Sequence, residues 1–375
     1  MVPIQMVDLK RQYLKIKPQV DQAILEVLEN TAFINGKPVQ QFSAALQQYL
    51  DIKHVIPCAN GTDALQIAMM ALDLQPGDEV ITPSFTFIAT AEVIALLRLK
   101  PIFVDVDPKT FCLDPVAVEK AITPRTKAIV PVHLYGHSAD MEPIMAIAAK
   151  HNITVIEDNA QAIGGTYTFK DGTKKKTGAI GHIGCTSFFP SKNLGGYGDG
   201  GALFTNDDAL AAKIRMVANH GQSARYYHDV VGVNSRLDTL QAVILNIKLP
   251  LLDEYIHARR RVAAAYNEAF SVHPEFTVPY EAPYSYHVYH QYTLQLNGID
   301  RDALIAHLQQ QQVPAMIYYP VPAHRQKMFA AFGGASFDLP ATDALTHQVV
   351  SLPIHTEMDK EQLAHIIKAV KSFLQ

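Results

Sequence analysis

The sequence predicts an α/β protein with a mostly parallel central sheet, helices on both faces of that sheet, and a smaller C-terminal α/β domain. Three observations predict it. Between residues 54 and 159, short apolar runs alternate with segments of helical periodicity, as in parallel sheets. The strand-like runs are almost continuously apolar, which a sheet buried on both faces requires. A long helical pattern at 237–266 then connects to a shorter strand–helix–strand–helix series.

The elements follow in order along the chain. Apolar residues at helical spacing predict two opening helices at 20–30 and 39–50. Short apolar runs then predict the sheet, with helices between them at 61–72 and around 89–97. These strands are expected at 54–59, 78–83, 101–107, 127–134, 154–159, 185–190 and 201–206. The C-terminal series is a strand at 290–296, a helix at 301–311, a strand at 315–319 and a helix at 360–374. We expect residues 1–245 to form the large domain and 246–375 the small one, which includes the connecting helix.

Composition excludes several classes of protein. The 375 residues are 48% hydrophobic and 18% charged, with a formal net charge of -4, which gives no reason to expect a nucleic-acid partner. The three cysteines lack CxxC spacing, and the N-terminus lacks the apolar core of a signal peptide, so a cytoplasmic protein is expected. No apolar run approaches the roughly 20 residues of a membrane span. The sixteen histidines show no metal-binding spacing, and no metal site is expected.

The segment after the first predicted strand has the features of a phosphate site. In an open parallel sheet, ligands gather at the carboxyl ends of the strands. There Asn60 is followed by Gly61, Thr62 and Asp63, which begin a helix. The free N–H groups of a helix start, together with a hydroxyl, suit a phosphate. The alternative is a simple helix cap by Asn60, Thr62 or Asp63.

Two other strand ends bring aromatic and acidic side chains to the same edge. Phe85 and Phe87 follow the second strand, where a flat ring can stack on a heteroaromatic ligand; the alternative is that both belong to the core. Asp158 ends the fifth strand, so its carboxylate is partly desolvated unless it is paired, or else it caps a helix. Glu157 should point to the opposite face, and Gln161 could reach the site of Asp158.

The stretch SFFPSKNLGGYGDGG at Ser187–Gly201 supplies an amine. Ser187 ends a strand and can bind a phosphate with its hydroxyl, and Lys192 is followed by five glycines. Glycines allow close approach of the backbone to a ligand and positive φ angles. A surface lysine in a glycine-rich turn is the alternative. That alternative leaves Pro190 and the apolar strand before it unexplained.

These pieces together suit one ligand. It has a phosphate, a flat ring, a ring nitrogen that pairs with an anion, a ring oxygen and a carbonyl that reacts with an amine. Pyridoxal 5′-phosphate has all five features. The glycine-rich surroundings of Lys192 then leave room for its side chain to move between the cofactor aldehyde and a substrate carbon.

At these residues the chain resembles the sugar aminotransferases of the DegT/DnrJ/EryC1 group, of fold type I among pyridoxal-phosphate enzymes. The resemblance covers nearly the whole chain. It is carried by CANGTDALQIA, GDEVITPSFTFIATAE, PIFVDVDP, VIEDNAQAIGG, TSFFPSKNLGGYGDGGALFTND and GVNSRLDTLQAVIL, in family order. Within the group it is most similar to UDP-2-acetamido-2-deoxy-ribo-hexuluronate 3-aminotransferases of bacterial surface-polysaccharide pathways, such as those of the lipopolysaccharide O-antigen.

The resemblance implies a role for each site residue. Lys192 forms the covalent bond to the cofactor and moves the proton, and Asp158 pairs with the ring nitrogen. Asn234 reaches the phosphate of the neighbouring subunit, which implies a homodimer with shared sites. The remaining contacts are Gln161 near the ring hydroxyl, Phe87 on the ring, and Gly61, Thr62 and Ser187 on the phosphate.

Substrate contacts are implied in a loop that departs from the family pattern. Many members have His-Tyr-Pro where this chain has Tyr318-Tyr319-Pro320, and His324 follows. The resemblance implies that Tyr319 and His324 of this loop bind substrate, although the departure weakens that implication for the loop. Arg236 is expected to grip the carboxylate of a uronic acid, since a guanidinium forms two charge-assisted bonds with such a group. The alternative is that Arg236 makes a structural ion pair, for example with Asp238.

The reaction implied is a transamination from L-glutamate to a keto group of a nucleotide-linked sugar. A dTDP-linked 3-keto or 4-keto 6-deoxy sugar is the alternative substrate. Three other functions are disfavoured by the residues. Sugar dehydratases of this fold carry histidine in place of Lys192; a non-catalytic cofactor-binding regulator would bring a basic nucleic-acid-binding module; and a nicotinamide-binding protein would show GxGxxG after the first strand.

Overall fold

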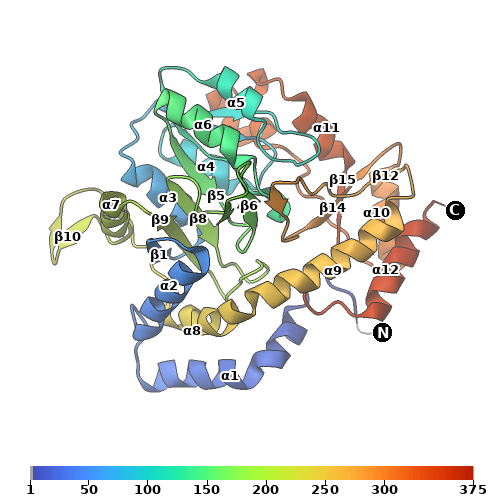
Figure 1. Cartoon of the computed structure of the whole chain (residues 1–375), viewed down its shortest axis with the longest axis horizontal. Helices are drawn as coiled ribbons and strands as arrows, with labels where there is room; N and C mark the ends of the chain where they lie inside the picture. The colour runs from blue at the N-terminus through green and yellow to red at the C-terminus, as the bar shows by residue number, and fades with distance from the viewer. Residues whose placement is uncertain (1–2, 375) are drawn as a thin grey trace.

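The protein is built around one seven-stranded sheet, seen in a computed structural model that describes residues 3–374 (Figure 1). The strand order is β1-β9-β8-β5-β4-β2-β3. Only β9 is antiparallel to its neighbours; the other pairs are parallel, which confirms the predicted class. The strands are β1 (His54–Cys58), β2 (Glu79–Pro83), β3 (Lys100–Val104), β4 (Thr126–Ile129), β5 (Thr154–Asp158), β8 (Ile183–Ser187) and β9 (Gly201–Thr205).

Helices cover both faces of this sheet, as its apolar strands require. One face packs against α3 (Gly61–Ala71), α4 (Ala89–Leu96) and α7 (Asp208–Ala218). The other face packs against α5 (Pro115–Ala121) and α6 (Met141–His151). At the β1–β9 end, that second face is covered by α2 (Lys37–Leu50) and α8 (Thr239–Lys248). The N-terminal helix α1 (Leu9–Glu29) lies along α8 (Figure 1).

Two hairpins and a small sheet complete the fold. β6 (Thr166–Thr168) pairs with both β7 (Lys174–Lys176) and β13 (Ser285–Tyr286), and the hairpin β10 (Gln222–Ala224)–β11 (Tyr227–His228) projects from the body (Figure 1). The C-terminal sheet contains β12 (Phe276–Thr277), β14 (Tyr292–Leu296) and β15 (Val349–Leu352). Its helices are α9 (Leu252–Phe270), α10 (Arg301–Gln310), α11 (Pro340–Gln348) and α12 (Lys360–Ser372).

Two predicted elements are corrected by the structure. The strand expected at 315–319 forms only an isolated bridge between Met316 and Ser351, and β15 takes the place beside β14. Prolines at 314, 320 and 322 flank that run and remove backbone donors. The single helix expected at 237–266 is two helices, α8 and α9, joined by a 3₁₀ turn at Leu249–Leu251, where Pro250 cannot continue the α-helical bonding.

The boundary predicted at residue 245 stays a prediction, but contacts cross it in both directions. The first half of α9 packs into the core of the large sheet, and its second half packs into the small C-terminal core. At the N-terminus, Arg11 bonds to Asp359 and Gln362 at the start of α12. The small sheet and the large one are therefore tied together by α9 and by the contact of Arg11 with the start of α12.

Candidate active site

The carboxyl ends of the parallel strands meet at one edge of the sheet, and Asp158 lies there at the end of β5. Its carboxylate is 6% exposed. One oxygen, Oδ2, accepts a hydrogen bond of 2.8 Å from Thr90, and Oδ1 accepts one of 3.1 Å from the amide of Ala160. Thr90 is fully buried on α4 and was not identified from the sequence. The carboxylate is thus held in place by neutral donors and forms no ion pair with any residue in 3–374.

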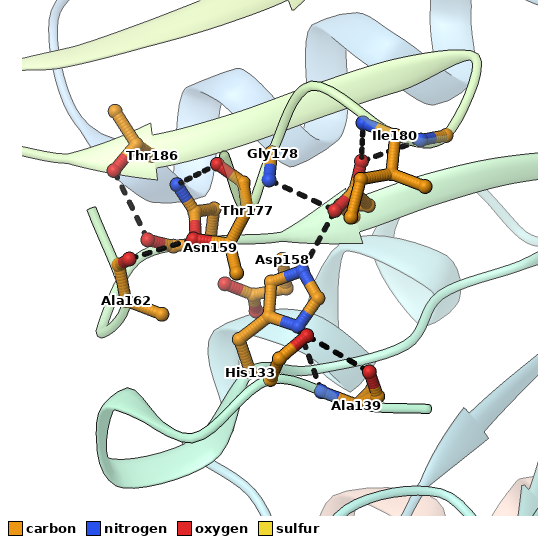
Figure 2. A network of polar contacts seen from close by, with 12 residues as sticks. His133, Ala139, Asp158, Asn159, Ala162, Thr177, Gly178, Ile180 and Thr186 are labelled. Atoms are coloured by element: carbon orange, nitrogen blue, oxygen red, sulfur yellow. Dashed lines mark hydrogen bonds and ion pairs between the residues drawn. The ribbon is translucent and has the colours of Figure 1, made fainter. Parts of the chain in front are cut away.

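A separate polar network behind β5 fixes the strand end on which Asp158 stands (Figure 2). Glu157 points to the opposite face, as predicted, where it accepts hydrogen bonds from the amides of Gly178, Ile180 and Gly181. His133 lies 2.8 Å from the same carboxylate. Because the other ring nitrogen of His133 accepts from an amide at 3.0 Å, the nitrogen facing Glu157 carries the proton. The buried carboxylate is fully satisfied, so it holds the strand end without competing for a ligand.

A cradle with the shape of an anion site lies at the start of α3. Asn60 caps the helix by accepting a hydrogen bond from the amide of Asp63, so the cap alternative is correct for this residue. The amides of Gly61 and Thr62, in the first turn, have no partner within the helix. A Cβ on Gly61 would lie 2.7 Å from the Cβ of Ser187, so only glycine fits there.

Ser187 brings a hydroxyl to this cradle from β8. Its Oγ accepts a hydrogen bond of 3.2 Å from the amide of Phe189. Gly201 on β9 stands between the ends of β1 and β8, opposite Cys58 and Ser187. A side chain at Gly201 would meet the carbonyl of Asn60 at 2.4 Å. The helix start, the hydroxyl and the glycine therefore form one compact group, which suits a phosphate.

Lys192 is partly buried, and its amine shares the edge with Asp158. Burial lowers the pKa of the amine to about 8, against the opposing attraction of the Asp158 charge. A neutral amine is the nucleophilic form, so this shift favours attack on a carbonyl near neutral pH. The alternative of an ordinary surface lysine is not supported by this environment.

The five glycines after Lys192 serve close packing, and the expectation of positive φ angles is corrected. None of them adopts a positive φ. A Cβ on Gly195 would lie 2.3 Å from the carbonyl oxygen of Pro190, and side chains at Gly196 and Gly198 would collide with Gln241 of α8. The loop that carries Lys192 is therefore thin because it is pressed against its own backbone and against α8.

Aromatic side chains from two segments flank the same edge. Phe85 is buried in the core, as the core alternative expects. Phe87 is 53% exposed, which leaves its ring available to stack on a ligand. The ring of Phe87 lies 6.2 Å from that of Tyr319. Gln161 donates a hydrogen bond of 3.0 Å to the Tyr319 hydroxyl and accepts one of 2.7 Å from the amide of Tyr135. Tyr319 and Gln161, both predicted site residues, are thus brought together.

His324 is placed differently from the other predicted site residues. Its side chain is fully buried, with Nδ1 2.7 Å from the Ser84 hydroxyl and Nε2 3.4 Å from Asp343. The backbone amides of Ala323 and His324 also donate to Ser84, which follows β2. His324 therefore fastens the loop that carries Tyr319 to Ser84, just after β2. This geometry gives no support to a direct contact with substrate, and that role stays a prediction.

Asn234 and Arg236 lie beside the phosphate cradle. Asn234 is exposed, while its neighbour Ser235 is buried, donates to Asp63 at 2.6 Å and accepts from the amide of Ala59 at 3.0 Å. Arg236 is partly buried and makes no ion pair with Asp238 or with any other residue in 3–374. The ion-pair alternative is therefore not seen within one chain.

One further residue near Lys192 escaped the sequence analysis. His290 is 5% exposed, and its Nδ1 has no partner within the described chain. Its pKa lies well below the usual value, because of burial first and then the charges of Lys192 and Arg259. A lone histidine before an apolar strand carries no pattern that could have identified it. Its proximity to Lys192 arises from long-range packing.

The residues present fit pyridoxal 5′-phosphate. The cradle of Gly61, Thr62 and Ser187 leaves space that a single Cβ would fill, and Phe87 leaves an apolar ring exposed beside it. Asp158 offers an anion and Lys192 a partly neutral amine at the same edge. No group of three histidine, cysteine or acidic residues in 3–374 is arranged to hold a metal ion. None of the helices described is both long and apolar enough to cross a membrane.

Three curated relatives match almost the full chain. One is a "pleiotropic regulatory protein" of Geobacillus stearothermophilus, 45% identical over 99% of this chain and 98% of its own length. The second is the UDP-2-acetamido-2-deoxy-3-oxo-D-glucuronate aminotransferase of Pseudomonas aeruginosa, 47% identical over 98% of this chain and 99% of its own. The third is a UDP-N-acetyl-3-dehydro-alpha-D-glucosamine 3-aminotransferase of Acidithiobacillus ferrooxidans, 45% identical over 99% of this chain and 98% of its own length.

Solved structures agree with the fold over the same span. An aminotransferase from Brucella abortus superposes with a TM-score of 0.93 at 40% identity, covering 99% of both chains. NtdA from Bacillus subtilis, solved with pyridoxamine phosphate bound, superposes with a TM-score of 0.92 at 31% identity, covering 99% of this chain and 85% of its own. The model of the DegT/DnrJ/EryC1/StrS aminotransferase family matches residues 14–371. The chain belongs to the DegT/DnrJ/EryC1/StrS aminotransferase family.

Proposed function

We propose that this aminotransferase moves an amino group from L-glutamate to the 3-keto group of UDP-2-acetamido-2-deoxy-ribo-hexuluronate. Its cofactor is pyridoxal 5′-phosphate. The observation that carries the proposal is the meeting of the Lys192 amine, with a pKa of about 8, and the buried Asp158 carboxylate beside the Gly61–Ser187 cradle. We place the reaction in the synthesis of a surface polysaccharide. We place it in the cytoplasm because free cysteines such as Cys58, Cys112 and Cys185 persist in that reducing compartment.

In this proposal the chemistry at the cofactor is carried out by Lys192 and Asp158. When bound, the cofactor supplies an aldehyde that exchanges amines and a ring that takes up the electron pair of the substrate carbon. Lys192 would hold the cofactor at its aldehyde and would serve as the general base that accepts the proton of the substrate carbon. Asp158, which Thr90 holds in place, would keep the ring nitrogen protonated.

The phosphate contacts are assigned to the same cradle. The free amides of Gly61 and Thr62 and the hydroxyl of Ser187 would receive the phosphate oxygens. Phe87 would lie on the ring, and Gln161, already bonded to Tyr319, would lie near the ring hydroxyl. Tyr319 would then stand between the cofactor and the sugar.

The uronate is favoured over a 6-deoxy sugar by two observations. The Pseudomonas relative, at 47% identity, is named for an oxo-glucuronate substrate, whereas the dTDP-sugar transaminase of Streptomyces venezuelae is 37% identical. Arg236 is partly buried and has no acidic partner within the described residues, so its guanidinium is available for a substrate carboxylate. The Geobacillus relative, at 45% identity, is named a regulatory protein. Measured turnover distinguishes an aminotransferase from a non-catalytic regulator.

A homodimer with shared sites is part of the proposal. Asn234 is exposed beside the cradle, and the neighbouring hairpin β10–β11 projects from the body with Tyr226 and Tyr227 at 78% and 69% exposed (Figure 1). Large exposed side chains of this kind gather where another chain binds. We expect Asn234 to contact the cofactor phosphate of the partner subunit.

The experiment is a coupled assay with purified protein, L-glutamate and a panel of UDP- and dTDP-linked keto sugars, read by product mass. We expect an amino product from the UDP-linked 3-keto uronate. Aspartate and glutamine in place of glutamate identify the donor. A product only from dTDP-linked 6-deoxy sugars would overturn the substrate assignment, and the absence of product from every sugar, with cofactor bound, would favour the regulatory alternative.

A further inference from the structure

Lys248 is a buried lysine that no catalytic role described so far requires. It ends α8 and is 1% exposed. Its Nζ donates one hydrogen bond, of 2.6 Å, to the carbonyl of Gly195, and lies 5.0 Å from the centre of the Tyr197 ring. Neither Lys248 nor its neighbour Arg259 forms an ion pair with any residue in 3–374. An amine buried without a carboxylate is costly, which calls for a reason for its presence.

Burial, followed by the charge of Arg259, lowers the pKa of Lys248 to about 7. The unfolded chain binds a proton at an ordinary lysine more tightly than the folded chain does. The folded state is therefore penalised at neutral pH by this side chain. A methionine of similar length would remove that penalty. Stability alone does not explain a lysine at this position.

The bond partner of Lys248 lies in the loop that carries Lys192. Gly195 follows Lys192 by three residues, and its backbone is pressed against the carbonyl of Pro190. Within the loop, the amide of Lys192 bonds to Phe189 at 2.9 Å. Gly195 and Lys192 therefore belong to one closely packed turn.

Few side-chain hydrogen bonds join this loop to other elements within residues 3–374. Gln241 of α8 accepts a hydrogen bond of 2.8 Å from the amide of Tyr197, and Asn193 donates one of 2.9 Å to the carbonyl of Val288. Gln241 and Lys248 are seven residues apart on one helix, so they lie on the same helical face. Together they bind the two ends of the Gly195–Tyr197 segment from the side of α8.

We propose that Lys248 is a positioning residue for Lys192. Its amine holds the Gly195 carbonyl, so that the backbone under Lys192 stays fixed while the Lys192 side chain moves between cofactor and substrate. A misplacement of about 1 Å in such a group costs on the order of 100-fold in rate. This inference rests on the role of Lys192 proposed above.

Lys176 provides a matched control. Its Nζ donates to the carbonyl of Gly164 at 3.2 Å and lies 4.6 Å from the centre of the Tyr49 ring, and burial lowers its pKa as well. It thus also contacts a glycine carbonyl and a tyrosine ring, but it is only partly buried and donates in addition to the Tyr49 hydroxyl at 3.4 Å. Lys176→Met removes a comparable amine without touching the catalytic loop.

The test compares Lys248→Met, Lys248→Gln and Lys176→Met in two measurements. The first is the melting temperature of the cofactor-free protein at pH 7, which we expect to rise in Lys248→Met. The second is steady-state kinetics, in which we expect kcat to fall at least ten-fold with KM for both substrates within about two-fold. Lys248→Gln, which keeps a neutral donor, should recover part of kcat, and Lys176→Met should leave kcat unchanged.

Two results would overturn the inference. A Lys248→Met protein with wild-type kcat would show that the loop needs no such anchor. A lower melting temperature or failure to fold would show that the amine stabilises the fold as a whole. Borohydride fixation of the cofactor in Lys192→Ala distinguishes failure of the Lys248 inference from failure of the proposed function. A covalent adduct in Lys192→Ala would refute the role of Lys192 itself, whatever the Lys248 variants do.

Discussion

The lowered pKa of Lys192 can be measured directly on the cofactor-free protein. With a pKa of about 8, about 9% of the amine is neutral at pH 7, against about 0.03% for a lysine at 10.5. Burial therefore raises the reactive fraction about 300-fold at neutral pH. Above pH 9 the advantage shrinks, because the amine is then almost fully neutral in the folded protein.

The perturbation that tests the cause of this pKa is Asp158→Asn. The Asp158 charge favours the ammonium form and raises the pKa that burial lowers. Removing the charge while keeping the shape should move the pKa of Lys192 further down. Thr90→Val is the matched control, since it removes a hydrogen bond to Asp158 but leaves the charge in place. Its midpoint should stay near that of the wild type.

The assay is labelling with an amine-selective acylating reagent between pH 6 and 10, followed by digestion and mass spectrometry of the peptide that contains Lys192. The exposed Lys109 in the same digest corrects for the reagent's own pH dependence. We expect a midpoint near 8 for Lys192 in the wild type and a lower one in Asp158→Asn. A wild-type midpoint near 10, or no change in Asp158→Asn, would refute the electrostatic reasoning.

Three further outcomes are expected. Gly61→Ala should weaken cofactor binding at least ten-fold in equilibrium dialysis, because its Cβ would lie 2.7 Å from that of Ser187; unchanged affinity with an intact fold would mean that the phosphate binds elsewhere. Mixing inactive Lys192→Ala and Asn234→Ala subunits should restore one of the two sites in each heterodimer, and no recovery after verified exchange would argue against shared sites. Arg236→Lys should lower kcat/KM for the uronate by about 1–3 kcal/mol in transition-state stabilisation, with the glutamate half-reaction unchanged; loss of both half-reactions would make Arg236 structural.

The parts of the site that could be predicted from sequence are those next to a strand end. Asp158 and Ser187 follow apolar runs, and the rule that ligands gather at carboxyl strand ends brings them to one edge without any knowledge of packing. The order of the chain places Gly61 there by the same rule. Such residues are local in sequence, and a parallel sheet makes them neighbours in space.

The residues that were missed act through long-range contacts. Thr90 reaches Asp158 across 68 positions, and Lys248 reaches Gly195 across 53. Each stands in a helix whose pattern reads as ordinary core, and neither helix face is fixed until the sheet is assembled. The run 315–319 was misassigned as a strand for a related reason, because Ile317, Tyr318 and Tyr319 pack against the core of the large sheet rather than joining a neighbouring strand. Tyr319 bonds to Gln161, which belongs to the large domain.

The positive charges around the loop that carries Lys192 suggest a shared role for Lys248 and His290, which were not identified from the sequence. Lys248 and Arg259 are buried and Lys192 is partly buried. The charges of Lys192 and Arg259 act on His290, which stays neutral, and Asp158 is the carboxylate that acts on Lys192. The pKa values of all three cations are lowered by burial, so their charges are under-compensated in the cofactor-free protein. An anionic cofactor and a uronic-acid diphosphate substrate would each relieve that excess. The same burial that makes Lys192 nucleophilic thus also favours anionic ligands, and one electrostatic arrangement serves both binding and catalysis.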